Sequence, residues 1–239
     1  MQRKKSFKRY VTTALAAVGF FAVTASAHAL SLRVIDGSTT IATVDDGGAG
    51  DINPLAGAVT YFGTFGAATM NINTGSSKPL IGSAGAPEMH LDGYLVSNSP
   101  ISLTLMLSDT GFTGSIGDFF AQLGGAFSNA SSNITYSIYR DLSDTLFGTD
   151  PASLVCSIGP LTLSPFAGTC GNTLNLASPY SITLVVTLNH GEGEGNNSSF
   201  NALVRDDARV PEPAAIILIG LGLIAVAKIS RRKEVQATL

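Results

Sequence analysis

Three aspartates and an asparagine stand close together around the glycines of residues 45–53, in the order Asp45-Asp46-Gly-Gly-Ala-Gly-Asp51-Ile-Asn53. Calcium binds carboxylate and carbonyl oxygens in flexible loops, so these four side chains are candidate calcium ligands. Their spacing differs from that of an EF-hand and lacks its closing glutamate. Asp, Asn and Gly are also common in turns, so a plain loop between two strands is the alternative interpretation.

A second cluster with ligand chemistry lies at His190-Gly-Glu192-Gly-Glu194-Gly. An imidazole and two carboxylates could hold a transition metal, whereas the alternating glycines favour a solvated hairpin loop. Glu192 and Glu194 could also be the paired carboxylates of a glycosidase, but so flexible a segment would not hold them in a productive geometry.

Other signs of catalysis are few. No Gly-x-Ser-x-Gly nucleophile elbow occurs, and the chain after residue 29 contains only two histidines, His90 and His190, and no tryptophan. A Ser-His-Asp triad can draw its members from distant positions, but serines and aspartates are so abundant that the pattern selects none of them. We therefore predict a protein that is not an enzyme and has no cofactor, apart from the candidate calcium ion. A secreted hydrolase is the less favoured alternative.

The distribution of charge limits the partners of the central region. Residues 30–213 contain five basic and 16 acidic side chains, a net charge of −11, whereas both ends of the chain are basic. Because nucleic acids require a basic footprint, this composition excludes a nucleic-acid-binding protein. Divalent cations and neutral sugars remain compatible, and an acidic surface that keeps the protein soluble is the simpler interpretation.

The elements that must position these residues have the pattern of short strands. Polar and apolar side chains alternate most clearly at residues 101–108 and 180–189. Further strands are expected at residues 32–34, 41–43, 57–63, 66–73, 93–97, 133–140, 153–158, 161–166 and 200–204. Asp36-Gly37 predicts a hairpin turn, and residues 116–123 are a candidate helix that Gly124-Gly125 would end. About ten strands predict an all-β fold, an antiparallel β-sandwich of the jelly-roll or immunoglobulin-like type, with a partly closed barrel as second choice.

The N-terminus has the features of an export signal. Five basic residues precede an apolar stretch at residues 11–24, and Ala27-His28-Ala29 is a small-residue cleavage site. We therefore predict that residues 1–29 are a signal peptide, with cleavage after Ala27 as the close alternative. The apolar stretch is too short to favour an uncleaved membrane helix.

The C-terminus carries the motif Pro211-Glu212-Pro213, an apolar run at residues 214–227 within a predicted helix at 214–230, and the basic cluster Arg231-Arg232-Lys233, in that order. The prolines favour an extended chain, and the apolar run can satisfy its backbone in lipid only as a helix. The basic cluster should stop transfer and stay on the cytoplasmic side. A single transmembrane helix is predicted; because the run is short, a buried core helix is the alternative.

Export also bears on the two cysteines, Cys156 and Cys170. In an oxidising compartment an even pair is expected to form a disulfide, which for a loop of this length contributes about 3 kcal/mol on chain-entropy grounds. No CxxC spacing or third cysteine supports the alternative, a metal or redox pair.

The C-terminal features together resemble a known sorting signal. Val210-Pro-Glu-Pro213, the Gly220-Leu-Gly222-Leu segment and the basic cluster are similar to the PEP-CTERM signal of Gram-negative bacteria. This resemblance covers about the last tenth of the chain. It implies export, anchoring in the inner membrane and processing near the Pro-Glu-Pro motif by an exosortase-type membrane protease. It also implies an association with exopolysaccharide.

We therefore expect a signal peptide at residues 1–29, an exported sandwich at 30–209 and a sorting signal at 210–233. The expected function is that of a non-enzymatic protein of the cell surface or extracellular matrix, anchored in the inner membrane and facing the periplasm before processing. A carbohydrate-binding module is the alternative. The expected partners are the exosortase-type protease, the Sec translocon, signal peptidase, the inner membrane and exopolysaccharide.

Overall fold

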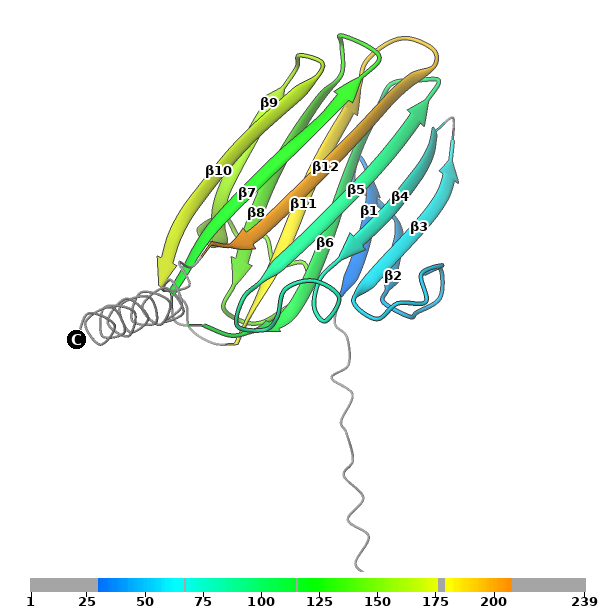
Figure 1. The fold of residues 1–239 in the computed structure, drawn as a ribbon. Helices are drawn as coiled ribbons and strands as arrows, with labels where there is room; N and C mark the ends of the chain where they lie inside the picture. The colour runs from blue at the N-terminus through cyan, green and yellow to red at the C-terminus, as the bar shows by residue number, and fades with distance from the viewer. Residues whose placement is uncertain (1–29, 67, 115, 176–178, 208–239) are drawn as a thin grey trace, which may run out of the picture.

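Two antiparallel sheets of six strands each form the protein in the computed structural model, which describes residues 30–207 except 67, 115 and 176–178 (Figure 1). The first sheet has the order β2 (Thr39–Asp45), β1 (Ser31–Asp36), β6 (Ile101–Phe112), β11 (Tyr180–His190), β8 (Asn133–Asp141) and β9 (Leu154–Leu161). The second sheet has the order β10 (Phe166–Asn175), β7 (Ile116–Phe127), β12 (Asn196–Asp206), β5 (Glu88–Ser97), β4 (Ala68–Ser76) and β3 (Ala58–Phe65). A short 3-10 helix, η1 (Pro151–Ser153), precedes β9.

From β5 onward the chain passes between the sheets as in a double-sheet jelly roll. In the second sheet β12 lies between β7 and β5, and in the first sheet β11 lies between β6 and β8. The β1–β2 hairpin widens the first sheet, and the β3–β4 hairpin widens the second. The predicted all-β sandwich is thus confirmed, and its strand order is that of the jelly-roll alternative.

The core lies between the sheets and is built from side chains with a period of two. In β11, Ile182, Leu184, Val186 and Leu188 are all fully buried, because alternate residues of a strand point to the same face. Burying an aliphatic side chain of this size contributes about 1.5–3 kcal/mol. The same alternation in β6 buries its leucines, so the two most regular segments of the sequence form the centre of the first sheet.

The helix predicted at residues 116–123 is wrong, because these residues form the first part of β7. Phe119 and Leu123 are buried while Gln122 is exposed, which is the alternation that a strand between β10 and β12 requires. The glycine pair does not end the element either. The ring of Phe166 in β10 lies 2.5 Å from the position that a Cβ at Gly125 would take, so this glycine allows the ring to pack.

The disulfide between Cys156 and Cys170 is confirmed, with the two Cα atoms 6.0 Å apart. Cys156 lies in β9, an edge strand of the first sheet, and Cys170 lies in β10, an edge strand of the second. The bond therefore joins the two sheets along one side of the sandwich. The strand predicted at residues 161–166 is misplaced, because β9 ends at Leu161 and β10 begins only at Phe166.

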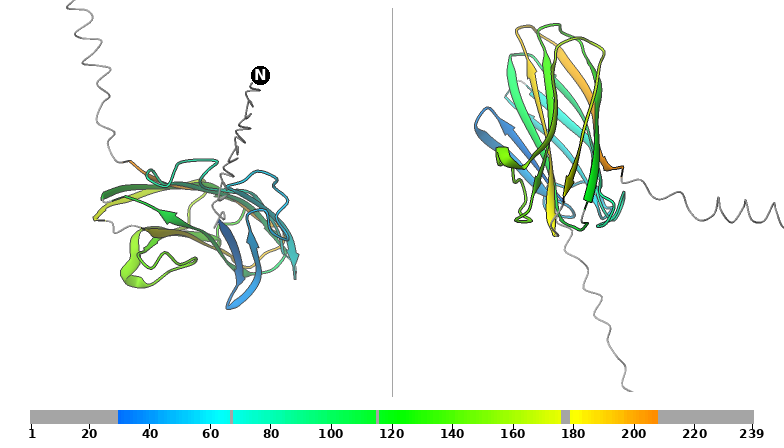
Figure 2. Two further views of the ribbon diagram at one scale, coloured as in Figure 1. Left: turned by 90° about the horizontal axis from the view of Figure 1, so that it is seen from below. Right: turned by 90° about the vertical axis from the view of Figure 1, so that its left-hand side faces the viewer.

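The described part of the chain begins and ends at the same end of the sandwich, which we call the lower end after its position in Figure 1. Ser31 at the start of β1 pairs with Ser108 near the end of β6, and Arg205 near the end of β12 pairs with Glu88 at the start of β5. Figure 2 shows the two curved layers from below and from one side. Among the described residues no helix has the length and hydrophobicity to cross a membrane. The predicted signal peptide and transmembrane helix lie outside the described residues.

Candidate functional site

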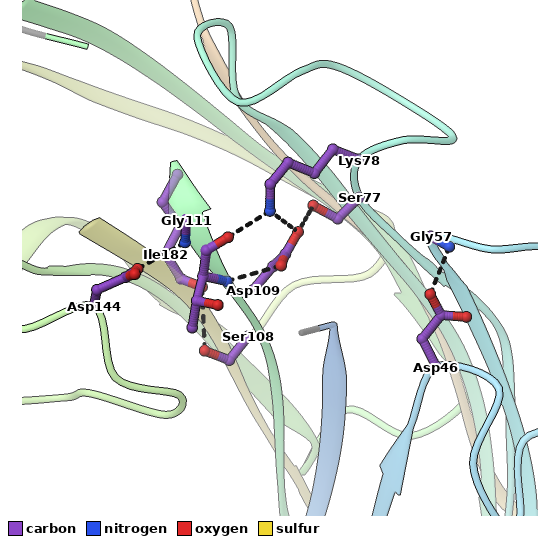
Figure 3. A network of polar contacts seen from close by, with 10 residues as sticks. Asp46, Gly57, Ser77, Lys78, Ser108, Asp109, Gly111, Asp144 and Ile182 are labelled. Atoms are coloured by element: carbon purple, nitrogen blue, oxygen red, sulfur yellow. Dashed lines mark hydrogen bonds and ion pairs between the residues drawn. The ribbon is translucent and has the colours of Figure 1, made fainter. Parts of the chain in front are cut away.

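The predicted calcium ligands lie at the lower end of the sandwich, in and after β2, and the three carboxylates have different hydrogen-bond partners. Asp45 Oδ1 accepts a hydrogen bond from the hydroxyl of Ser31 at 2.7 Å. Asp46 Oδ2 accepts a hydrogen bond from the backbone N–H of Gly57 at 2.6 Å, on the right of Figure 3. These two neighbouring carboxylates therefore have separate structural partners.

Asp51 organises the backbone of the same loop. Its Oδ1 accepts hydrogen bonds from the backbone N–H groups of Asn53 and Thr60, and its Oδ2 accepts one from Gly47, each at 2.9 Å. In the part of the chain that the structure describes, no group of three or more His, Cys, Asp or Glu side chains is placed to hold a metal ion. These contacts fit a loop between two strands, which was the alternative interpretation, and the calcium site stays a prediction.

His190 is separated from the glutamates that were grouped with it. Its ring is buried between the sheets at the upper end, where Nδ1 lies 2.6 Å from the hydroxyl of Ser97 and Nε2 lies 2.5 Å from that of Ser198. Burial lowers the pKa of His190 below its ordinary value. Glu192 and Glu194 lie in the exposed connection that follows. The structure therefore does not bring these three residues together. Instead, His190 on β11 of the first sheet contacts Ser97 and Ser198 of the second sheet and so links the two sheets.

A buried ionic cluster lies at the lower end and was not predicted from the sequence. Asp109 in β6 is 1% exposed, and its Oδ2 accepts hydrogen bonds from Ser77 Oγ at 2.6 Å and Lys78 Nζ at 2.8 Å (Figure 3). Lys78 Nζ also donates to the carbonyl of Thr110 at 2.5 Å and lies 4.2 Å from the centroid of the Phe112 ring. The charge of Asp109 is therefore compensated, and the cluster joins the β4–β5 connection to β6.

The outer face of the first sheet is partly covered by residues 142–150, which connect β8 to η1. The backbone N–H of Phe147 donates to Ser108 Oγ at 2.9 Å, and the guanidinium of Arg33 lies 3.9 Å from the centroid of the Phe147 ring. Asp144 Oδ1 accepts a hydrogen bond from Gly111 at 2.7 Å (Figure 3). Phe147 has a φ of 61°, which is unusual for a large side chain, so these contacts hold the connection against local strain.

The outer face of the second sheet carries two exposed aromatic rings in one row. Phe62 in β3 pairs with Asn71 in β4, and Asn71 pairs with Tyr94 in β5. Phe62 is 60% exposed and Tyr94 is 42% exposed. Because adjacent strands lie about 4.8 Å apart, the two rings stand on strands separated by about 10 Å. Aromatic rings on an open face can stack against the apolar faces of a ligand.

Three polar side chains lie next to Tyr94 on the same face. Asn201 Nδ2 in β12 lies 2.7 Å from Asp92 Oδ1 and 2.7 Å from His90 Nε2. His90 Nδ1 lies 3.6 Å from Asp92 Oδ2. The trio is partly exposed and holds a single carboxylate, whereas glycoside hydrolysis uses two. Together with the two rings it forms a surface suited to binding a hydroxyl-rich ligand, and this surface is the candidate site.

A hollow of about 370 Å³ lies at the lower end of the second sheet. It is lined by Asp118, Phe119, Phe120, Gly171, Asn172, Thr173 and Asp207. Thr173 Oγ1 donates to Asp118 Oδ1 at 2.9 Å, and the backbone N–H of Asp207 donates to the carbonyl of Asp118 at 2.7 Å. The last described residue of the chain is thus part of the hollow.

Comparison with known families identifies the segment that follows. Residues 209–233 match the PEP-CTERM protein-sorting motif, so this is a protein that carries a PEP-CTERM sorting motif, as its sequence indicated. The motif indicates an exported protein that is anchored in a membrane and then processed by exosortase, a membrane protein. The predicted processing residues, Pro211, Glu212 and Pro213, and the predicted basic cluster, Arg231, Arg232 and Lys233, fall inside the match and outside the described residues.

No curated protein matches the chain. Solved structures that match the chain include the enzymatically active domain of tailspike protein 4 of bacteriophage CBA120, with 12% identity and a TM-score of 0.33 over 66% of this chain and 20% of that one. A carbohydrate-binding module of the β-sandwich superfamily has 16% identity and a TM-score of 0.31 over 72% of each chain. The K3 cleaved adhesin domain of Lys-gingipain from Porphyromonas gingivalis w83 has 14% identity and a TM-score of 0.24 over 74% of this chain and 91% of that one. Similarity at this level assigns no function.

Proposed function

We propose that the protein is a non-enzymatic component of the cell surface or extracellular matrix, delivered there by its C-terminal sorting motif. The match at residues 209–233 is the observation that carries this proposal. The contacts of the described residues support it, because the buried side chains of His190 and Asp109 form hydrogen bonds that link different strands and connections. An exported sandwich with a disulfide between its sheets suits a stable extracellular role.

The route to the surface follows from the order of the segments. The signal peptide directs the chain to the Sec translocon and is removed by signal peptidase at residue 29. Residues 214–230 then anchor the protein in the inner membrane with the sandwich in the periplasm, and the basic cluster at 231–233 stops transfer because moving charge through hydrocarbon is costly. An exosortase-type protease acts near Pro211-Glu212-Pro213, after which the product reaches the surface and associates with exopolysaccharide.

The test is a substitution in the processing motif. Glu212→Ala should leave the protein exported but unprocessed and therefore in the membrane fraction. Glu234→Ala is the matched control, because this glutamate lies outside the matched residues and should be processed normally. The measurement is mass spectrometry of the C-terminal peptide, combined with membrane and medium fractions from the native host. Mature wild-type protein that still carries residues 231–239 in a host with an exosortase would show that the tail is a plain anchor.

A second candidate function is glycan binding, which the row of Phe62, Asn71 and Tyr94 favours. Two rings carried on strands about 10 Å apart match roughly the length of a disaccharide, and the polar trio beside Tyr94 offers hydrogen bonds to hydroxyl groups. The net negative charge of the region disfavours polyanionic glycans.

Calorimetric titration can test this candidate with cellohexaose, isomaltohexaose and the neutral exopolysaccharide of the native host. Tyr94→Ala and Phe62→Ala should each weaken binding at least about tenfold, the equivalent of about 1.4 kcal/mol. Leu163→Ala is the control, because Leu163 is 79% exposed but lies in the β9–β10 connection. Binding that neither aromatic substitution weakens would exclude this face, and absence of binding to all three probes would exclude the candidate function.

A further inference from the structure

Three exposed aliphatic side chains lie at the lower end of the sandwich, in the connections between β2 and β3 and between β4 and β5 (Figure 1). Ile52 and Leu55 in the first connection are more than half exposed, and Leu80 in the second is nearly half exposed. Among the large exposed apolar side chains of the described ranges, Leu163 is the one in a connection at the upper end. Scattered single leucines are normal on a surface, whereas a group at one end indicates a contact surface. We call Ile52, Leu55 and Leu80 the lower apolar patch.

The backbone holds the two connections of the patch against each other. The N–H of Ser77 donates to the carbonyl of Gly57 at 2.9 Å. A Cβ at Gly57 would lie 2.8 Å from Pro79 Cδ and 2.9 Å from the backbone nitrogen of Leu80, so the absence of a side chain permits this approach. Within the first connection the carboxylate of Asp51 accepts backbone hydrogen bonds on both of its oxygens. The apolar side chains are therefore carried at the surface by two fixed, contacting segments.

The chain leaves the sandwich beside the second of these connections. The N–H of Asp206 at the end of β12 donates to the carbonyl of Pro87, the last residue of the β4–β5 connection, at 2.9 Å. The predicted membrane helix begins at Ala214, seven positions after Asp207. Because an extended chain spans at most about 3.6 Å per residue, this tether can reach no more than about 25 Å. The 11 residues of β12 span roughly 36 Å, so the upper end lies much farther from the anchor than the lower end does.

We propose that the lower apolar patch docks on the surface of the membrane while the protein is anchored there. The short tether brings the lower end to the lipid, and aliphatic side chains of fixed loops can enter the apolar region beneath the headgroups. The β2–β3 connection contains Asp46 and Asp51 and no basic residue, so the lipid that fits the patch is a zwitterionic phospholipid and not an anionic one. The inference rests on the membrane-anchored stage of the proposed function.

Tryptophan fluorescence tests the docking directly, because the chain contains no tryptophan of its own. Leu55→Trp places a probe in the patch, and Leu163→Trp is the matched control at the upper end. The full-length protein is produced in a host without an exosortase and reconstituted in vesicles of phosphatidylcholine, with or without bromine atoms in the upper part of the acyl chains. The brominated lipid should quench Leu55→Trp at least about twofold and leave Leu163→Trp unchanged. Equal emission of Leu55→Trp in both kinds of vesicle would overturn the proposal.

A second set of variants shows whether the native side chains hold the patch at the lipid, since tryptophan itself favours membrane interfaces. Adding Ile52→Ser and Leu80→Ser to Leu55→Trp should reduce the quenching, whereas adding Leu163→Ser should not. Urea unfolding of each variant shows that the sandwich stays folded. Quenching that the two serines leave unchanged would also overturn the proposal.

Flotation of the vesicles separates this inference from the proposed function. Protein that does not float with the vesicles would contradict anchoring and so overturn both. Protein that floats while Leu55→Trp is not quenched would overturn the docking alone. A failure of the Glu212→Ala experiment would overturn processing at the motif and leave the quenching results unchanged.

Discussion

Lys78 and Asp109 form an ion pair at the lower end of the sandwich, with Nζ and Oδ2 2.8 Å apart. The side chain of Asp109 is 2% exposed and that of Lys78 is 21% exposed. Lys78 precedes the second sheet's β5 in the chain and Asp109 belongs to the first sheet, so the pair links segments of both layers. Lys78 is also the only lysine between residues 30 and 207, and its charge is used inside the fold.

Removing the cation should destabilise the protein strongly. Lys78→Met leaves the buried carboxylate of Asp109 without its ionic partner, and we expect the free energy of unfolding to fall by about 3 kcal/mol in urea titrations. Lys78→Met combined with Asp109→Leu should recover much of this loss. The control is Arg205→Met, which breaks an exposed pair with Asp207 and should cost less than about 1 kcal/mol. Equal losses for the two single variants would contradict this assignment.

The buried histidine should make stability depend on pH. Burial lowers the pKa of His190, so below its ordinary pKa of 6.5 the unfolded chain binds a proton that the folded chain does not. The stability that the neutral ring contributes is therefore present above pH 6.5 and decreases as the pH falls through and below this value. His190→Gln should flatten the decrease measured by urea unfolding between pH 7.5 and 5. His90→Gln should keep the wild-type slope, because His190 is still present; a slope lost in both variants would contradict the assignment.

The hydroxyl of Tyr136 should be dispensable. It is buried in β8, it has no hydrogen-bond partner among the described residues, and burial raises the pKa of Tyr136 well above its usual value. Because an unsatisfied buried hydroxyl costs about 1 kcal/mol or more, Tyr136→Phe should raise the free energy of unfolding by about 1 kcal/mol. Tyr139→Phe on the outer face of the same strand is the matched control and should change little. A destabilised Tyr136→Phe variant would reveal a partner for the hydroxyl.

The disulfide should contribute to stability on the scale expected from its loop. Cys156 and Cys170 are 14 residues apart, and Cys156→Ser with Cys170→Ser should lower the free energy of unfolding by about 3 kcal/mol. Intact mass before and after reduction and alkylation shows whether the wild type carries the bond. Two free thiols in protein recovered from the periplasm would contradict the structure.

Local sequence was sufficient to predict a strand where one face of that strand is buried. Residues 101–108 and 180–189 alternate because their inward side chains form the core, and Asp36-Gly37 lies at the turn between β1 and β2, with Gly37 at a φ of 58°. Local sequence was insufficient to predict β7, because Phe119, Phe120 and Leu123 also fit one face of a helix. Only pairing with β10 and β12 decides that these residues form a strand.

The candidate surface could not be read from local sequence for a related reason. Phe62 and Tyr94 are neighbours only through the register of β3, β4 and β5, and Asn201 joins His90 and Asp92 from more than 100 residues away. The disulfide was predictable because it was inferred from export and from the even number of cysteines, and neither requires knowledge of the strand register. The calcium site stays a prediction, because the sequence supplies the ligand types whereas backbone hydrogen bonds orient the carboxylates of Asp46 and Asp51.

The central position of β12 determines when this protein can fold during export. β12 is the last strand of the described residues, yet it lies between β7 and β5, so the second sheet stays divided until the chain up to residue 206 is available for pairing. β11, almost as late in the sequence, completes the middle of the first sheet in the same way. Such long-range pairing is slow, and unpaired strand edges are open to proteases in the meantime. The sorting motif begins three residues after β12 ends, so the sandwich can close only when nearly all of the chain that precedes the motif is available for pairing.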